Sequence, residues 1–294
     1  MNTMREQPDS GIEAHWQPPA DNHVHSQWSW DTQSGDMMRT CARAVELGLP
    51  SVAFTEHLDL TRWTLPPTVT MPPEWASFIH GTTMQAPALD VPGYLSSVAE
   101  CRERFPSLRI FSGLEISEPH WHPAEVSALI ATGSFERLLA SQHSGPLLNG
   151  DGVMEFSALY LERTPREVVQ LYLAQILELV TQSDAFEVLA HIDYPVRYWP
   201  IDGPSFDPLE FRDEFHAVLE VLAASGRALE SNTRVPLCFE VLRWWHDVGG
   251  QAITFASDAH HPEALAIGFR EATALASAAG FRPGKDPLEF WGRA

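Results

Sequence analysis

Cysteine, long apolar runs and positive charge are all scarce in this sequence of 294 residues. The three cysteines, Cys41, Cys101 and Cys238, lie far apart and form no C-x-x-C pair. Such a set argues against a disulfide framework, and we expect buried thiols in a reducing compartment.

No run of about eighteen apolar residues occurs, and the polar N-terminus has no segment typical of a signal peptide. We therefore expect a soluble, cytoplasmic protein without a membrane partner. Residues 1–18 are polar and rich in proline and charge, which predicts a flexible tail. Residues 19–294 are expected to form a single domain.

The formal net charge is -20 at pH 7. A surface this acidic repels nucleic acids and anionic membranes, so we expect neither as a partner. A small phosphorylated metabolite remains compatible with this charge if a local site supplies positive charge. The sequence does not define an oligomeric state.

Short β-prone segments alternate with longer segments of helical period. The predicted strands are residues 20–25, 51–57, 109–115, 137–143, 186–193, 227–233 and 252–260. Strict alternation predicts parallel strands joined by crossover helices in an α/β fold. Seven such units favour a closed, TIM-like (β/α)7 barrel. An open doubly wound sheet is the alternative, but no G-x-G-x-x-G or P-loop motif follows a predicted strand.

Two connections are unusually long, residues 59–92 and residues 144–163. The first is rich in proline and tryptophan, and both follow predicted strands. We expect them to lie over the same end of the sheet, as lids or pocket walls.

Every predicted strand carries a candidate metal ligand or acid/base group at its C-terminal end. These groups are Asp21, His23, His25, Glu56, His57, Glu115, His143, His191, Asp193, Glu230, Asn232, Asp258 and His260. The C-terminal ends of parallel barrel strands converge on one mouth, so these side chains are expected to meet there. His23 and His25 alternate along one strand and should face the same side, as should Asp258 and His260.

The predicted ligands offer only nitrogen and oxygen, which suits Zn²⁺, Mn²⁺ or Fe. They exceed what one tetrahedral ion needs, so two or three divalent ions sharing a bridging carboxylate are expected. Three carboxylates such as Asp31, Glu115 and Asp258 would leave a positive surplus that attracts phosphate. A metal-bridging hydroxide attacking phosphorus is the chemistry that such a centre supports.

Several short motifs occur in a characteristic order: DNHVHS at 21–26, TEH at 55–57, GLE at 113–115, SQH at 141–143, AHID at 190–193, ESNT at 230–233 and SDAH at 257–260. In this order the sequence resembles the polymerase and histidinol phosphatase (PHP) superfamily of metal-dependent phosphoesterases, over residues 20 to 262. The resemblance implies a distorted seven-stranded β/α barrel and a trinuclear metal site with Glu115 as the bridging carboxylate. The implied ligands are His23, His25, Asp31, His57, Glu115, His143, His191, Asp258 and His260.

Within the superfamily the sequence is most similar to the histidinol-phosphatase branch, which implies hydrolysis of L-histidinol phosphate in histidine biosynthesis. Arg197 stands where that branch has an arginine that holds phosphate, and Arg234 is a second choice. Glu115 and Asp258 are expected to take part in catalysis with Arg197, whereas Ser26 and Glu56 are expected to contact substrate. Glu56 and Asp193 could instead orient ligand histidines.

Two features depart from this branch and bear on the leaving group. The loop at 59–92 has unusual tryptophan and proline content, and EISEPHWHP follows the third strand. His120 and His122 in that segment are expected on a surface loop, with substrate contact as the alternative. A PHP-type phosphodiesterase or nuclease, and a metal-dependent protein that binds a phosphorylated ligand without hydrolysing it, remain alternative functions.

Overall fold

The computed structural model describes residues 16–294. Residues 1–15, which hold most of the predicted tail, lie outside the described residues. Trp16 contacts helix α8 (Phe269–Ala279), because its indole N–H donates to Thr273 Oγ1 at 3.3 Å and Arg270 lies over its ring.

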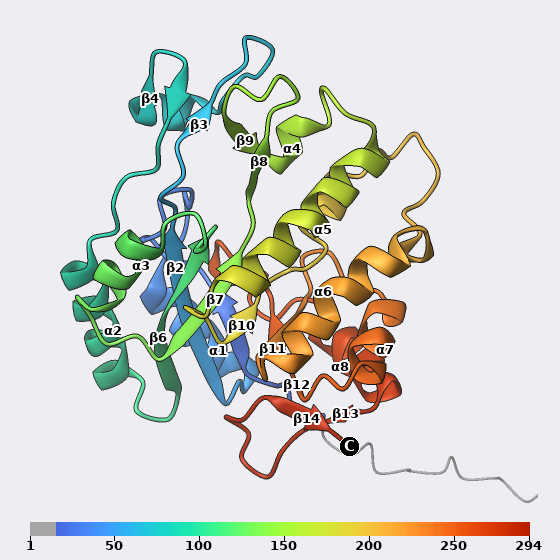
Figure 1. The fold of residues 1–294 in the computed structure, drawn as a ribbon. Helices are drawn as coiled ribbons and strands as arrows, with labels where there is room; N and C mark the ends of the chain where they lie inside the picture. Colours follow the sequence, from blue (N-terminus) through green and yellow to red (C-terminus); the bar gives the residue numbers. More distant parts are fainter. Residues whose placement is uncertain (1–15) are drawn as a thin grey trace, which may run out of the picture.

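A curled sheet of parallel strands forms the centre of the α/β fold (Figure 1). Its parallel strands, in spatial order, are β1 (Asp21–Val24), β2 (Ser51–Leu58), β6 (Arg109–Ser117), β7 (Arg137–Ser141), β10 (Val188–Leu189), β11 (Ala228–Asn232) and β12 (Ala252–Ala256). Each lies within a predicted strand or extends it by one or two residues. The chain order equals the spatial order, as expected for successive β/α units.

The first and last of these strands approach each other at one end of the sheet. His25 N donates to Ala259 O at 2.9 Å, and Asp258 N donates to His23 O at 2.9 Å. This pairing brings the two strand ends that carry alternating ligands directly side by side.

Helices flank the sheet on its outside (Figure 1). They are α1 (Met37–Leu47), α2 (Val91–Arg104), α3 (Pro123–Ile130), α5 (Pro165–Gln182), α6 (Arg212–Ala224), α7 (Phe239–Asp247) and α8. Their ends follow local sequence signals: Thr164 and Glu167 form a reciprocal capping box at the start of α5, and α1 ends at Gly48 in the left-handed conformation. Apolar faces of α5, α6 and α7 pack on the sheet and bury Tyr172 and Trp245 completely.

Both long connections carry secondary structure that the sequence did not predict. Residues 59–92 contain β3 (Trp63–Thr64), the 3-10 helix η1 (Pro73–Phe78), β4 (Ile79–His80) and β5 (Thr83–Met84). Residues 144–163 contain β8 (Ser144–Pro146), β9 (Val153–Glu155) and α4 (Phe156–Leu159). Strands of two or three residues are too short for alternation to reveal them. The two insertions lie over the same end of the molecule, as expected (Figure 1).

The C-terminus also differs from the simple repeat. Strands β13 (Phe281–Arg282) and β14 (Trp291–Arg293) form an antiparallel hairpin that extends the sheet beyond β12. The hairpin lies at the end of the molecule opposite to the two insertions (Figure 1). Short 3-10 helices complete the fold: η2 (Tyr194–Tyr198), η3 (Pro208–Phe211) and η4 (Pro262–Ala264).

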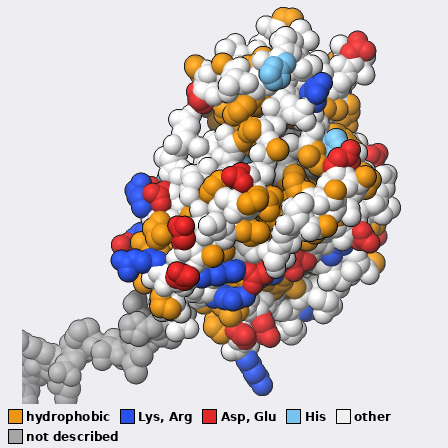
Figure 2. All heavy atoms as spheres, turned by 90° about the vertical axis from the view of Figure 1, so that its left-hand side faces the viewer, with side chains coloured by type: hydrophobic (Ala, Val, Ile, Leu, Met, Phe, Trp, Pro, Cys, Tyr) orange, Lys and Arg blue, Asp and Glu red, His pale blue; other side chains and the backbone are white. Residues whose placement is uncertain are grey.

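Within residues 16–294, no helix combines the length and apolar character needed to span a membrane. On the face shown in Figure 2, basic and acidic side chains are interspersed and form no continuous basic stripe.

Candidate metal centre

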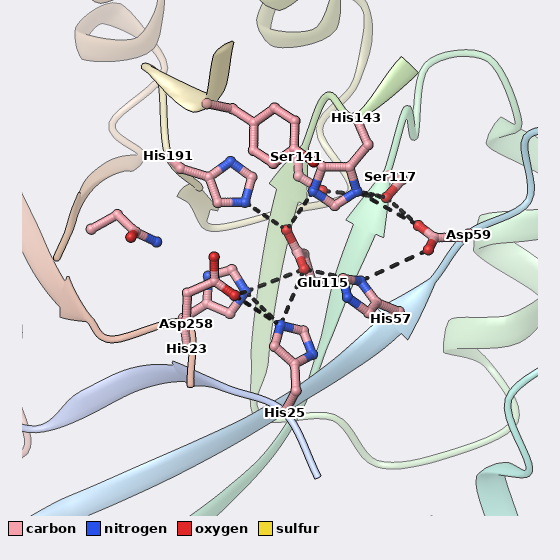
Figure 3. A network of polar contacts seen from close by, with 12 residues as sticks. His23, His25, His57, Asp59, Glu115, Ser117, Ser141, His143, His191 and Asp258 are labelled. Atoms are coloured by element: carbon pink, nitrogen blue, oxygen red, sulfur yellow. Dashed lines mark hydrogen bonds and ion pairs between the residues drawn. The ribbon is translucent and has the colours of Figure 1, made fainter. Parts of the chain in front are cut away.

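The predicted ligands converge at the C-terminal ends of the parallel strands, around the carboxylate of Glu115 (Figure 3). Glu115 Oε1 lies 2.8 Å from His191 Nε2 and 3.2 Å from His143 Nε2. Its other oxygen, Oε2, lies 3.1 Å from His57 Nδ1 and 3.2 Å from His23 Nε2. The two oxygens of this carboxylate thus face different pairs of histidines.

The remaining predicted ligands extend the centre on the β1–β12 side. Asp258 Oδ1 lies 3.5 Å from His25 Nε2. Asp31 Oδ2 lies 3.1 Å from His260 Nε2 and 3.3 Å from His57 Nε2. Asp31 therefore lies beside two of the predicted ligand histidines.

Four overlapping triplets of side chains could each hold an ion, with ligand atoms within 4.8 Å of one another. The triplets are His25, His57 and His260; His23, His25 and Asp258; His23, Glu115 and His191; and His57, Glu115 and His143. The triplets share His23, His25, His57 and Glu115, so the side chains able to hold metal form one contiguous cluster.

Hydrogen-bond acceptors behind the rings, a carboxylate for His23 and a backbone carbonyl for His260, determine which ring nitrogen carries the proton. His23 Nδ1 donates to Glu230 Oε2 at 2.8 Å, which leaves Nε2 as an acceptor facing the centre. His260 Nδ1 donates to Asp258 O at 2.9 Å with the same result.

Two further histidines are oriented through a serine. Ser29 Oγ donates its only proton to Glu56 Oε2 at 2.6 Å, so it can only accept from His25 Nδ1 at 2.9 Å. Likewise Ser117 Oγ donates to Asp59 and accepts from His143 Nδ1 at 2.8 Å. In both pairs the imidazole keeps Nε2 unprotonated toward the centre.

These assignments test whether the residues fit a metal ion. The Nε2 atoms of His23 and His25 lie only 3.0 Å apart, and both are acceptors once Nδ1 carries the proton. Glu115 Oε2 lies 3.4 Å from His25 Nε2, so a third acceptor enters the same space. Converging acceptors without a donor repel one another, and a cation between them removes that repulsion. The donor set therefore fits divalent metal.

Without a metal ion, protons balance the negative charge of the buried centre. Burial alone would lower the pKa of its histidines, but nearby carboxylates raise the pKa of His23 and His57 well above the usual range and that of His143 to about 10. Burial alone would raise the pKa of Glu115, but these three histidines, when protonated, hold it well below its usual range. A divalent ion would take the place of those protons. Burial lowers the pKa of His191 to about 4, which favours a neutral imidazole, the form that binds metal.

A cavity of about 500 Å³ opens directly above the centre. Arg197 and Arg234 both line it, beside Asp258. Arg197 Nη2 donates to Asp258 Oδ2 at 2.6 Å, and its side chain is 9% exposed. The side chain of Arg234 is 50% exposed, with Nη1 3.9 Å from the same oxygen. Two guanidinium groups thus border the centre. Arg197 is more buried than Arg234 and lies closer to Asp258.

Ser26 and Glu56 require a correction. Both are completely buried, and Ser26 N and Oγ donate to the Glu56 carboxylate at 3.1 and 2.5 Å. Neither lines the cavity, so their placement does not support the predicted substrate contact. Glu56 instead faces Ser29, which matches the alternative that it orients a ligand histidine.

His120 and His122 do not line the cavity either. Both are partly buried, and His122 Nε2 lies 3.0 Å from Thr61 Oγ1 at the start of the first insertion. They are therefore less exposed than the surface loop we expected, and Thr61 of the insertion contacts His122.

Sequence reasoning missed Asp59, Ser29 and Ser117 behind the ligands, and it did not assign a partner to Glu230. Asp59 follows His57 by two positions, so strand alternation could have indicated a shared face. Glu230 is a strand-end residue, but nothing local assigns it to His23. Ser29 and Ser117 carry no sequence signal, since serine is common in loops and strands alike.

Comparison with known proteins places the chain in a family. The PHP domain model matches residues 21–234. The histidinol-phosphatase of Lactococcus lactis subsp. lactis is 25% identical over 269 residues, covering 89% of this chain and 91% of the relative. A protein of Clostridium acetobutylicum named "Probable histidinol-phosphatase" is 23% identical over 270 residues, covering 90% of this chain and 94% of the relative.

A solved structure shares the fold. The histidinol phosphate phosphatase of Lactococcus lactis, complexed with zinc, L-histidinol and phosphate, matches with a TM-score of 0.76 and 24% identity. The match covers 94% of this chain and 99% of that chain. The family model spans well over half of the sequence, and the chain belongs to the PHP domain family.

Proposed function

We propose that this protein is a metal-dependent phosphomonoesterase whose substrate is L-histidinol phosphate or a close analogue. The observation that carries the proposal is the convergence of histidine nitrogens and carboxylate oxygens on Glu115, with Arg197 beside them. The names of the two relatives support histidinol phosphate as the substrate.

The ions would be held by His23, His25, Asp31, His57, Glu115, His143, His191, Asp258 and His260. We infer two or three divalent ions, zinc, manganese or iron, with Glu115 as the shared carboxylate. Bound ions of this kind supply Lewis acidity and activate water for attack on phosphorus. We also propose that the parallel strands close into a distorted seven-stranded barrel formed by residues 19–294.

The chain's own residues position the phosphate. Arg197 presents a planar fork that suits two phosphate oxygens, and its present partner Asp258 holds the guanidinium at the edge of the centre. Arg234, which is half exposed, can approach the same group from the cavity mouth. Buried carboxylates behind the histidines keep the imidazoles in the orientation that metal requires.

Phosphate release by the protein loaded with Zn²⁺, Mn²⁺ or Fe²⁺ tests this function. We expect turnover of L-histidinol phosphate that chelator abolishes and metal restores. Faster hydrolysis of bis-p-nitrophenyl phosphate or of a labelled oligonucleotide would instead establish a phosphodiesterase. Tight binding of the substrate without product would establish a binding protein.

A further inference from the structure

The cavity has a polar floor and a largely apolar roof. Its floor consists of the candidate ligands with Arg197, and its roof comes from the two insertions, including Trp63, Met71, Trp75 and Met154. If the proposed phosphate position on the floor is correct, the leaving group must lie against the roof. The roof residues therefore decide which phosphomonoesters fit.

Glu155 is a carboxylate of this roof. It ends β9, caps α4 and lines the cavity. Its Oε1 accepts from the Tyr194 hydroxyl at 2.8 Å, and its Oε2 accepts from Ser157 N at 2.9 Å and from the Ser157 hydroxyl. These donors are all neutral. Throughout the described range 16–294, no basic side chain forms an ion pair with Glu155, and His143 and Arg197 act on it only at longer range.

The enclosed position makes this carboxylate costly without a counter-ion. Burial raises the pKa of Glu155 to about 7, although hydrogen bonding to Tyr194 lowers it. A cation in the cavity would stabilise the ionised form, because opposite charges attract strongly where water is scarce. A carboxylate oxygen has room for a further donor beyond those present.

Tyr194 sets the spacing between Glu155 and the metal centre. Its ring centroid lies 5.0 Å from the ring of His143 and 5.1 Å from that of His191, while its hydroxyl contacts Glu155. The side chain of Tyr194 thus lies between the Glu155 carboxylate and the histidines of the centre. A small leaving group attached to a phosphate on the floor can span this interval.

We infer that Glu155 is the counter-ion for a cationic nitrogen of the leaving group. The cavity would then select phosphomonoesters with an ammonium or imidazolium group a few bonds from phosphorus, with the tryptophans and methionines of the roof packing on the carbon skeleton. This inference rests on the proposed function for the placement of phosphate.

Calorimetric titration of the zinc-loaded protein with L-histidinol tests it without turnover. We expect Glu155→Gln to bind L-histidinol about tenfold or more weakly than the wild type, the loss typical of one charged hydrogen bond. Glu162→Gln is the matched control, because Glu162 lies in the same insertion outside the cavity and pairs with Arg163. Equal affinity of the wild type and Glu155→Gln, or no binding by the wild type, would overturn the inference.

Kinetics supply a second measurement. Glu155→Gln should reduce the ratio of kcat/KM for L-histidinol phosphate to that for p-nitrophenyl phosphate, whereas Glu162→Gln should preserve the ratio. A ratio unchanged in Glu155→Gln would contradict the assigned role even if both rates fell. The wild type alone should also prefer O-phosphoethanolamine to ethyl phosphate, and equal rates would count against the counter-ion even if a variant failed to fold.

The two proposals can fail separately. Weakened binding of L-histidinol by Glu155→Gln without phosphate release by any metal-loaded form would retain the cation site and reject the phosphatase. Normal phosphate release with an unchanged substrate ratio would retain the phosphatase and reject the cation site.

Discussion

His23 and Glu230 are 207 positions apart in the chain, yet His23 Nδ1 donates to Glu230 Oε2 at 2.8 Å. Glu230 also accepts from His191 N at 3.1 Å and from Asn232 Nδ2 at 2.8 Å, so one buried carboxylate serves the ends of β1 and β10. The contact fixes the imidazole of His23 with its acceptor nitrogen toward the centre.

Replacing Glu230 should therefore weaken metal binding. In Glu230→Gln an amide group can take the place of the accepting oxygen, and His23 would lose its preferred tautomer. We expect metal affinity to fall about 10- to 100-fold, measured by competition with a chromophoric chelator. Glu220→Gln, on the exposed face of α6, is the control. Unaltered zinc affinity in Glu230→Gln would show that the histidine needs no such partner.

The serine between His25 and Glu56 gives a separate prediction. Ser29→Ala removes the acceptor for His25 Nδ1 and leaves a buried N–H unpaired. We expect a loss of about 1–3 kcal/mol in the free energy of metal binding or of unfolding, with Ser34→Ala as an exposed control. Titration calorimetry with zinc and chemical denaturation measure the two quantities. If Ser29→Ala matched the wild type in zinc affinity and in unfolding free energy, Ser29 would not orient His25.

Arg197→Lys should reduce phosphate recognition without unfolding the protein. A lysine keeps the charge next to Asp258 but has no planar fork for two phosphate oxygens. We expect kcat/KM for L-histidinol phosphate to fall about 10- to 100-fold, corresponding to about 1.5–3 kcal/mol for a charged hydrogen bond. Arg166→Lys on the surface of α5 should behave as wild type. Full activity in Arg197→Lys would show that Arg197 does not bind the phosphate through its guanidinium group.

Metal should also stabilise the fold. His23 Nε2, His25 Nε2 and Glu115 Oε2 converge on one space, and only the folded state brings them together to bind an ion. At a free zinc concentration about 1,000 times Kd, the gain is about 4 kcal/mol. Differential scanning calorimetry should show a higher Tm with zinc than with chelator. The same Tm with zinc and with chelator would argue against a metal centre at this position.

Much of the fold was predictable because its signals are local. Alternating β-prone and helical segments located all the parallel strands, and the motifs at their ends located the candidate ligands that meet at Glu115. The insertions were recognised as unusual and placed over one end. Their short strands and the C-terminal hairpin β13–β14 were not predicted, since pairing rather than residue pattern defines them.

The sequence by itself determined which chemical groups follow each strand and the order of those strands, because periodicity and strand direction depend only on neighbouring residues. Only the tertiary structure decided that Ser29 and Ser117 connect histidines to buried carboxylates, that Ser26 and Glu56 are buried outside the cavity lining, and that Glu155 enters its roof. The serine contacts join separate segments of the chain, and the position of Glu155 depends on how an insertion without regular periodicity packs.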